Sequence, residues 1–259
     1  MKRKHIFPNL YLAVVMIVMY LPLVFLVLYS FNESKLNASW TGFSLRWYEE
    51  LLRDRNLMEA LKNSILLGVL SCLVSAVIGT LGAVGMARAD FKSKGMVEYI
   101  STLPIMIPEI ILGMVFLAFF SFLNLPFGMT TLVIAHTTFC IPYIFTMVKA
   151  RLVGIDKSLE EAARDLGASP VRSFFDIVLP LIAPAVVSGS LLAFAMSFDD
   201  VVISIFVTGP RMSTMPIKVY TQMKTGVTPE INALCTVILV VVTTVVLLTS
   251  AISRKNKAK

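Results

Sequence analysis

Long apolar stretches alternate with short polar ones along the whole chain. Each apolar stretch is long enough to cross a hydrocarbon core of about 30 Å as a helix. The pattern therefore predicts an all-α, polytopic membrane protein, with one transmembrane domain over 1–259. The six predicted spans cover about 9–31, 63–87, 99–123, 127–148, 181–207 and 231–252.

The polar stretch 149–180, between the fourth and fifth predicted spans, carries a helical pattern of its own. Ser158 followed three residues later by Glu161 is typical of a capping box at a helix start. Apolar positions then recur on one narrow face, at Leu159, Ala162, Ala163 and Leu166. Such a stripe has little to bury against inside its own loop.

A turn and a second short helix are predicted to follow. Gly167 stands where a helix C′ residue adopts a left-handed backbone. Ser169 and Pro170 have the types preferred at the N-cap and at the first position of a helix. The sequence therefore predicts a helix–turn–helix between two very apolar segments.

This loop resembles the cytoplasmic coupling loop of bacterial ABC importer permeases, whose pattern is E-A-A-x3-G-x9-I-x-L-P. Its specified positions are all present, at Glu161, Ala162, Ala163, Gly167, Ile177, Leu179 and Pro180. The resemblance implies a type I ABC importer permease fold and a loop that docks into a groove on a separate ATPase subunit. The alternative is a capped amphipathic helix on the membrane surface, which leaves the spacing of the glycine and the I-x-L-P run unexplained.

Composition and charge agree with a membrane protein and suggest its orientation. The 259 residues are 57% hydrophobic and 15% charged, too apolar for an ordinary soluble domain. Of the 23 lysines and arginines, 15 lie in the N-terminal head, the second and fourth loops and the tail. The positive-inside rule places these parts, with both termini, in the cytoplasm. The net charge of +7 thus indicates orientation and not binding to nucleic acid.

A cleaved signal peptide is an alternative for the first span, but that apolar run is long and lacks a small-residue cleavage site.

Three acidic residues fall inside the predicted spans, namely Glu109, Asp199 and Asp200. A carboxylate at bilayer depth costs about 2.5–3.5 kcal/mol on insertion scales, and no lysine or arginine lies within the spans to pair with it. The acids could be protonated or hydrogen-bonded to neighbouring hydroxyls such as that of Ser197. Three acids without a basic partner favour a path for a cationic solute, and we expect Ser197 to bond the adjacent carboxylates.

Other residues in or near the spans admit two interpretations. Pro104 and Pro108 stand close to Glu109, where they indicate either a break that lines a cavity or an ordinary kink. Trp47 and Tyr48 could stack on an ammonium group or anchor the chain at the membrane interface.

The remaining candidate residues receive no chemical role. His136 is predicted to be a hydrogen-bonded packing residue. The cysteines lack metal-ligand spacing and are interpreted as small buried hydrophobes, at Cys72, Cys140 and Cys235.

A second resemblance narrows the substrate class. The runs Ser197–Val202 and Phe206–Pro210 are similar to the spermidine/putrescine subclass of these permeases, in its second membrane subunit, and so is Trp47-Tyr48. Members of the subclass carry Asp where Glu109 stands, a change that keeps the charge and extends its reach. The similarity implies a substrate path formed by Trp47, Tyr48, Glu109, Ser197, Asp199 and Asp200.

The same resemblance implies the partners. They are a homologous permease subunit in a heterodimer, two copies of a cytoplasmic ATPase subunit and a periplasmic polyamine-binding protein, at a bacterial plasma (inner) membrane. The sequence lacks a phosphate-binding Gly-x-x-x-x-Gly-Lys-Ser/Thr loop and catalytic or metal constellations, so neither an enzyme nor a cofactor is predicted. The alternatives are a permease for another cation or small solute, such as thiamine or ferric iron, an ion-driven secondary transporter, or a scaffold protein.

Overall fold

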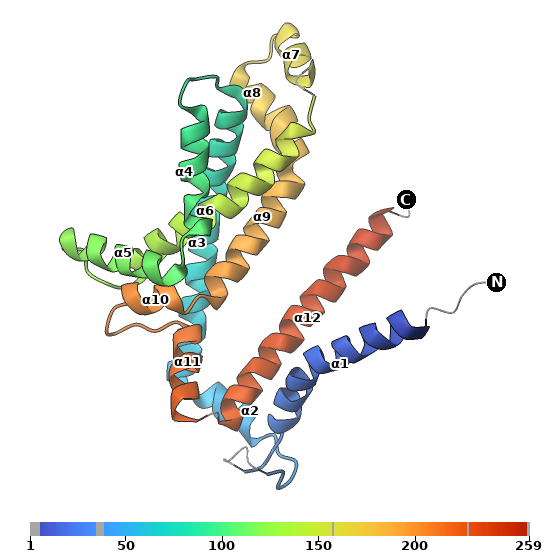
Figure 1. Ribbon diagram of the computed structural model, residues 1–259, viewed down its shortest axis with the longest axis vertical. Helices are drawn as coiled ribbons and strands as arrows, with labels where there is room; N and C mark the ends of the chain where they lie inside the picture. Colours follow the sequence, from blue (N-terminus) through green and yellow to red (C-terminus); the bar gives the residue numbers. More distant parts are fainter. Residues whose placement is uncertain (1–5, 35–38, 157, 227, 258–259) are drawn as a thin grey trace. The chain divides into compact units, whose positions relative to one another are not determined.

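The computed structural model describes residues 6–34, 39–156, 158–226 and 228–257, and within them it is helical almost throughout (Figure 1). Extended pairing among these residues is limited to one bridge between Asn32 and Phe43. The predicted all-α class is confirmed. The helices are α1 (Ile6–Tyr29), α2 (Arg46–Arg53), α3 (Arg55–Arg88), α4 (Lys94–Met106), α5 (Glu109–Phe122), α6 (Met129–Val153), α7 (Ser158–Asp165), α8 (Pro170–Ser173), the π-helical turn η1 (Phe174–Val178), α9 (Leu179–Asp199), α10 (Val202–Val207), α11 (Met215–Thr225) and α12 (Pro229–Lys257).

Residues 1–58 and 219–259 form one compact unit, and residues 59–218 form the other. In the first unit, α12 packs against both α1 and α2. The short helix α2 is amphipathic and buries Trp47 and Leu51, while its charged residues face outward. Its apolar stripe therefore holds it to the unit although it is only eight residues long.

In the second unit, α6 is the central helix and packs against α9 and α4. Close approach of α6 and α9 depends on Gly189, where an added Cβ would lie 3.1 Å from the Cα of Ile144. Small residues allow this because, in lipid, helix association rests on van der Waals packing and not on expulsion of water. The core around this contact contains Leu132, Phe139, Ile144, Val148, Ile182 and Ala193.

The third predicted span, 99–123, contains the helix break that was one of the two interpretations of Pro104 and Pro108. The structure has two helices there, α4 and α5, bent by 106° to one another. Ile107, between them, has an extended backbone with ψ 131°, and Pro108 follows it. A residue before proline is pushed out of the helical region, and proline itself has no N–H for the helical ladder, so the helix ends here.

The fifth predicted span, 181–207, is divided between two helices in the structure. Helix α9 ends at Asp199, Asp200 is extended with ψ 123°, and α10 begins at Val202. Sequence hydropathy did not detect this break because the residues on both sides are equally apolar.

The N-terminal end of α9 is continuous with α8 through the turn η1. In this turn the N–H of Leu179 bonds to the carbonyl of Phe174, five residues back. Pro180 follows directly and cannot donate to the helical ladder, which accounts for the wide turn at this place.

Four helical segments are long and apolar enough to cross a membrane, and the bent pair of α4 and α5 supplies a fifth if it counts as one span. In α12 the apolar part that can be described runs over Pro229–Thr244 and is shorter than a full span. Six spans in one domain therefore stay a prediction. The four long segments are Asn9–Tyr29, Arg55–Arg88, Met129–Val153 and Pro170–Asp199.

We expect Gly209→Ala to lower the thermal midpoint of the purified protein. A Cβ at this buried position would lie 2.3 Å from the carbonyl oxygen of Phe127, which is backbone and cannot turn away. Overpacking of this kind costs about 1–3 kcal/mol. Gly85→Ala is the control, because a Cβ there meets nothing within 4 Å and replaces a glycine inside α3. An equal midpoint for both variants would contradict the packing described here.

Candidate functional site

Two of the three predicted acids lie at the surface of the second unit. Glu109 begins α5, Asp199 ends α9, and both residues are exposed. Helix α5 packs against α10, and Gly113 makes this possible because an added Cβ would lie 2.4 Å from the Phe206 ring. The Glu109 carboxylate lies within electrostatic range of Asp199 and Asp200. The fold thus gathers all three acids around one helix break.

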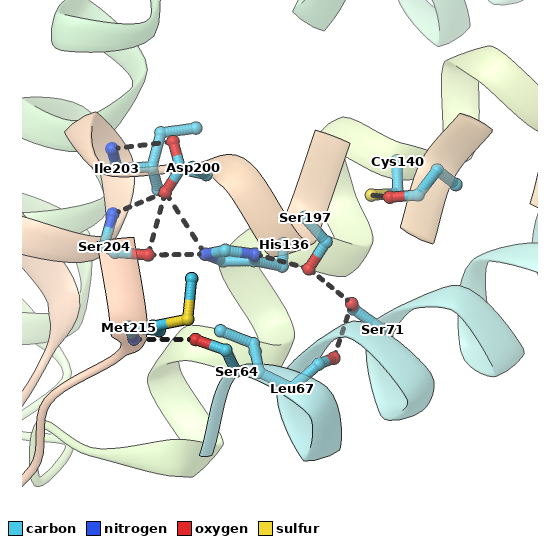
Figure 2. Close-up of polar contacts among 11 residues, drawn as sticks. Ser64, Leu67, Ser71, His136, Cys140, Ser197, Asp200, Ile203, Ser204 and Met215 are labelled. Carbon is cyan, nitrogen blue, oxygen red and sulfur yellow. Dashed lines mark hydrogen bonds and ion pairs between the residues drawn. The ribbon is translucent and has the colours of Figure 1, made fainter. Parts of the chain in front are cut away.

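Asp200 differs from the other two acids because its side chain is only 4% exposed. Oδ1 accepts the backbone N–H of Ile203 at 3.2 Å, and Oδ2 accepts the N–H of Ser204 at 2.8 Å (Figure 2). The hydroxyl of Ser204 also donates to Oδ2, at 2.8 Å. The carboxylate therefore satisfies the backbone donors of the first turn of α10, which the break leaves without helical partners.

His136, on α6, is fully buried beside Asp200. Its Nε2 lies 3.0 Å from the Ser204 Oγ and 3.4 Å from the Asp200 Oδ2. Its Nδ1 lies 2.8 Å from the Ser197 Oγ, which lies 3.0 Å from the Ser71 Oγ (Figure 2). One polar network thus connects α3, α6, α9 and α10.

This network corrects two expectations from the sequence. Asp200 has a basic partner in its own chain, which is His136 and not a lysine or arginine. The Ser197 hydroxyl contacts His136 and Ser71 and not a carboxylate. The sequence showed an ionisable ring, that of His136, inside a predicted span. It did not indicate that Asp200 would be its partner. The side chain of Asp199 has no hydrogen bond or ion pair with any residue that the structure describes.

Trp47 and Tyr48 belong to the first unit. The Trp47 ring is 3% exposed and donates its N–H to the Asn32 carbonyl at 2.6 Å, and the Tyr48 hydroxyl lies 2.7 Å from the Ser30 Oγ. The guanidinium of Arg46 lies 5.3 Å from the Trp47 ring centroid. The cation that this ring faces here comes from its own chain, so a role for Trp47 and Tyr48 in a substrate path stays a prediction.

The start of the predicted loop helix differs from the expected capping box. Helix α7 begins at Ser158, whose N–H donates to the Asp156 Oδ1 at 2.9 Å. This hydrogen bond, together with one from the Ser158 hydroxyl, holds the pKa of the exposed Asp156 carboxyl below its ordinary value. Ser158 is thus the first helical residue and not the N-cap. The expectation failed because aspartate is an equally good cap and stands two residues earlier.

The end of this helix is as predicted. Gly167 has φ +86°, its N–H bonds to the Arg164 carbonyl at 2.8 Å, and the next N–H, of Ala168, bonds to the Ala163 carbonyl at 2.9 Å. These two bonds form a Schellman motif, whose C′ position favours glycine. The N-cap at Ser169 is confirmed as well, since its hydroxyl accepts the N–H of Arg172 at 3.2 Å.

The apolar stripe of the loop is exposed. Leu159 is 47% exposed, Leu166 90% and Val171 67%, while Ala162 is exposed and Ala163 half-buried. The loop is also tied to the membrane-spanning part, because Arg88 at the end of α3 forms an ion pair with Glu160 at 2.7 Å.

The other residues of the coupling pattern divide between the loop and α9. Glu161 lines a hollow with Arg88 and Arg164. Ile177 lies in the turn η1, while Leu179 and Pro180 form the first turn of α9.

The family described as "Binding-protein-dependent transport system inner membrane component" matches residues 75–256. The spermidine/putrescine transport system permease protein PotC of Haemophilus influenzae is 40% identical over 248 residues, which cover 96% of this chain and 96% of that one. The putrescine transport system permease protein PotI of Escherichia coli is 43% identical over 228 residues, which cover 85% of this chain and 81% of that one.

Solved structures share the fold at lower identity. A bacterial ABC transporter involved in the import of the acidic polysaccharide alginate matches with a TM-score of 0.71 and 15% identity, over 95% of this chain and 94% of that one. The MetNI methionine ABC transporter matches with a TM-score of 0.58 and 22% identity, over 83% of this chain and 99% of that one.

We expect a small cationic thiol reagent to modify Asp199→Cys at least several-fold faster than Asp200→Cys. Residue 199 is exposed beside the acid cluster, whereas residue 200 is buried. The experiment uses a background in which Cys72, Cys140 and Cys235 are replaced by alanine, with Glu109→Cys as a second exposed position. Equal rates at 199 and 200 would contradict the placement. Protection of both exposed positions would indicate that they face lipid and not water.

Proposed function

Because the chain belongs to the family of binding-protein-dependent transport system inner membrane components, we propose that it is the permease subunit of an ATP-driven importer that moves polyamines into the cytoplasm. The observation that carries the proposal is its similarity, over nearly its whole length, to permeases named for spermidine and putrescine. The chain is a membrane transport component and not an enzyme.

The exposed acids suit a polyamine. Such a molecule presents ammonium groups separated by methylenes, so its path needs separated carboxylates. Glu109 and Asp199 are exposed and stand on different helices. One charge pair at 4 Å is worth about 1 kcal/mol in water and about 4 kcal/mol at an effective dielectric of 20. Attraction of this size allows capture and release, which a path requires and a tight binding site would prevent.

The exposed loop suits a docking role. In our proposal α7 and α8 contact a separate ATPase subunit through the apolar stripe of α7, with Leu159 and Leu166, and through Val171 of α8. A soluble surface rarely gathers such side chains without a partner. The ion pair between Arg88 and Glu160 fastens this stripe to the membrane-spanning part, so that force applied to the loop reaches α3 as well as α9.

The remaining partners and the orientation follow from the same proposal. The assembly pairs this chain with a homologous permease subunit in a heterodimer, two copies of the ATPase subunit and a periplasmic polyamine-binding protein. It lies in the bacterial inner membrane with the loop 149–180 and both termini in the cytoplasm. The bias of lysine and arginine toward these parts supports that orientation.

We expect Gly167→Val to uncouple ATP hydrolysis from transport. A β-branched residue is strained at φ +86°, and a left-handed backbone costs an ordinary residue about 1–2 kcal/mol. Substrate-stimulated ATPase activity in liposomes should therefore fall roughly tenfold while the subunits still assemble.

Gly167→Asn is the matched control, because asparagine tolerates the left-handed region. It should retain most of the stimulation. Stimulation that is unchanged in the valine variant would defeat this account of the turn.

We expect Asp199→Asn and Glu109→Gln each to reduce uptake of radiolabelled putrescine and spermidine roughly tenfold, because each removes one charge worth a few kcal/mol at most from the path. Asp90→Asn makes the same chemical change in the exposed turn between α3 and α4 and should leave uptake unchanged. Wild-type uptake by both path variants, at equal amounts in the membrane, would refute the cation path. Uptake of thiamine or ferric iron in place of polyamines would refute the substrate class alone.

A further inference from the structure

The polar network at the helix break raises the question of what Asp200 does. Its carboxylate already accepts three hydrogen bonds, two from the backbone of α10 and one from the Ser204 hydroxyl. The His136 ring closes its remaining side at 3.4 Å. A buried carboxylate with its partners in place has little capacity left for an ammonium group of a passing solute.

The hydrogen bonds on the Ser204 side show which nitrogen of the His136 ring donates. The single hydroxyl proton of Ser204 goes to Asp200, so Ser204 Oγ can only accept from the ring, and Nε2 carries a proton. On the other side Ser71 donates to the Leu67 carbonyl at 2.7 Å. The Ser197 Oγ lies between the Ser71 Oγ and the ring Nδ1, within hydrogen-bond distance of both.

The position of the ring ties two helix ends together. Ser197 lies in the last turn of α9 and Ser204 in the first turn of α10, on either side of the break. His136 reaches both from α6, with one nitrogen for each. The bridge fixes which of the two adjacent acids turns inward, because only Asp200 lies on the His136 side. Asp199 is left on the exposed side.

We propose that His136 is a positioning residue of the cation path. It holds Asp200 inside the protein, beside Ser204 at the start of α10, and so presents Asp199 to the solute. Asp200 does not contact the solute. The inference rests on the proposed function, since it takes the exposed acids to be a path for ammonium groups, but the geometry at the break can be tested apart from transport.

The first test is a double-mutant cycle on polyamine uptake with His136→Ala, Asp200→Asn and the two combined. If His136 acts through Asp200, the combined variant is no worse than the more impaired single variant, to within about twofold. The KM for the polyamine rises several-fold in each single variant, and the maximal rate changes less. If Asp200 binds the solute by itself, the two effects multiply, and the proposal is overturned.

Two further variants separate positioning from packing. Thr137→Val alters the next buried residue of α6, whose hydroxyl has no partner among the described residues, and should leave the KM unchanged. His136→Gln keeps a side-chain N–H near Ser204, so its KM for the polyamine should lie between that of the wild-type protein and that of His136→Ala. It also serves as the test variant if His136→Ala does not assemble. A packing role alone would reduce the amount of assembled protein at an unchanged KM.

The second test is thiol labelling, which needs no transport. In the cysteine-free background, His136→Ala should slow modification of Asp199→Cys and speed that of Asp200→Cys, each several-fold, because the break is no longer fixed. An unchanged labelling pattern would overturn the proposal. If the wild-type protein transports no polyamine, the proposed function fails while labelling still decides whether His136 positions the acids.

Discussion

A helix that begins within an apolar environment has backbone N–H groups in its first turn that water cannot reach, and each needs a partner. At the start of α10 that partner is the Asp200 carboxylate, which accepts the N–H groups of Ile203 and Ser204. The turn of the chain toward α10, the contact of α10 with α5 and the exposure of Asp199 all follow from this single cap. The membrane environment raises the free-energy cost of burying the Asp200 charge. It also excludes water, which could otherwise replace the hydrogen bonds that the carboxylate accepts.

The sequence predicted those parts of the structure that depend on near neighbours. The left-handed Gly167 and the Ser169 cap need only residues within five positions, and both were found in the expected places. The start of α7 was misplaced because two good capping residues, Asp156 and Ser158, stand two positions apart in the same short stretch. Local rules rank such residues but do not choose between them.

Features that depend on distant residues could not be predicted in this way. Hydropathy averages over many positions, so it passes across the break at Asp200. The break at Ile107 was indicated in the sequence by Pro108, as one of two interpretations. The pairing of His136 with Asp200 joins residues 64 positions apart, and nothing in the spacing indicates it. The same is true of Gly113, whose importance appears only when Phe206 is seen against it. Acidic residues clustered within a span indicated a functional region, but they did not indicate the role of each acid.

Helix α9 has Leu179 and Pro180 in its first turn and Asp199 in its last, and Ile177 lies just before it in η1. Its 21 residues form a rod about 30 Å long. A helix resists stretching more than it resists bending, so a push along its axis at one end is carried toward the other end. No chain of side-chain rearrangements is needed between the loop and the acid. Helix α9 thus acts as a rigid rod between the loop and Asp199, and the wide turn η1 is the joint at the end of α9 that meets the loop.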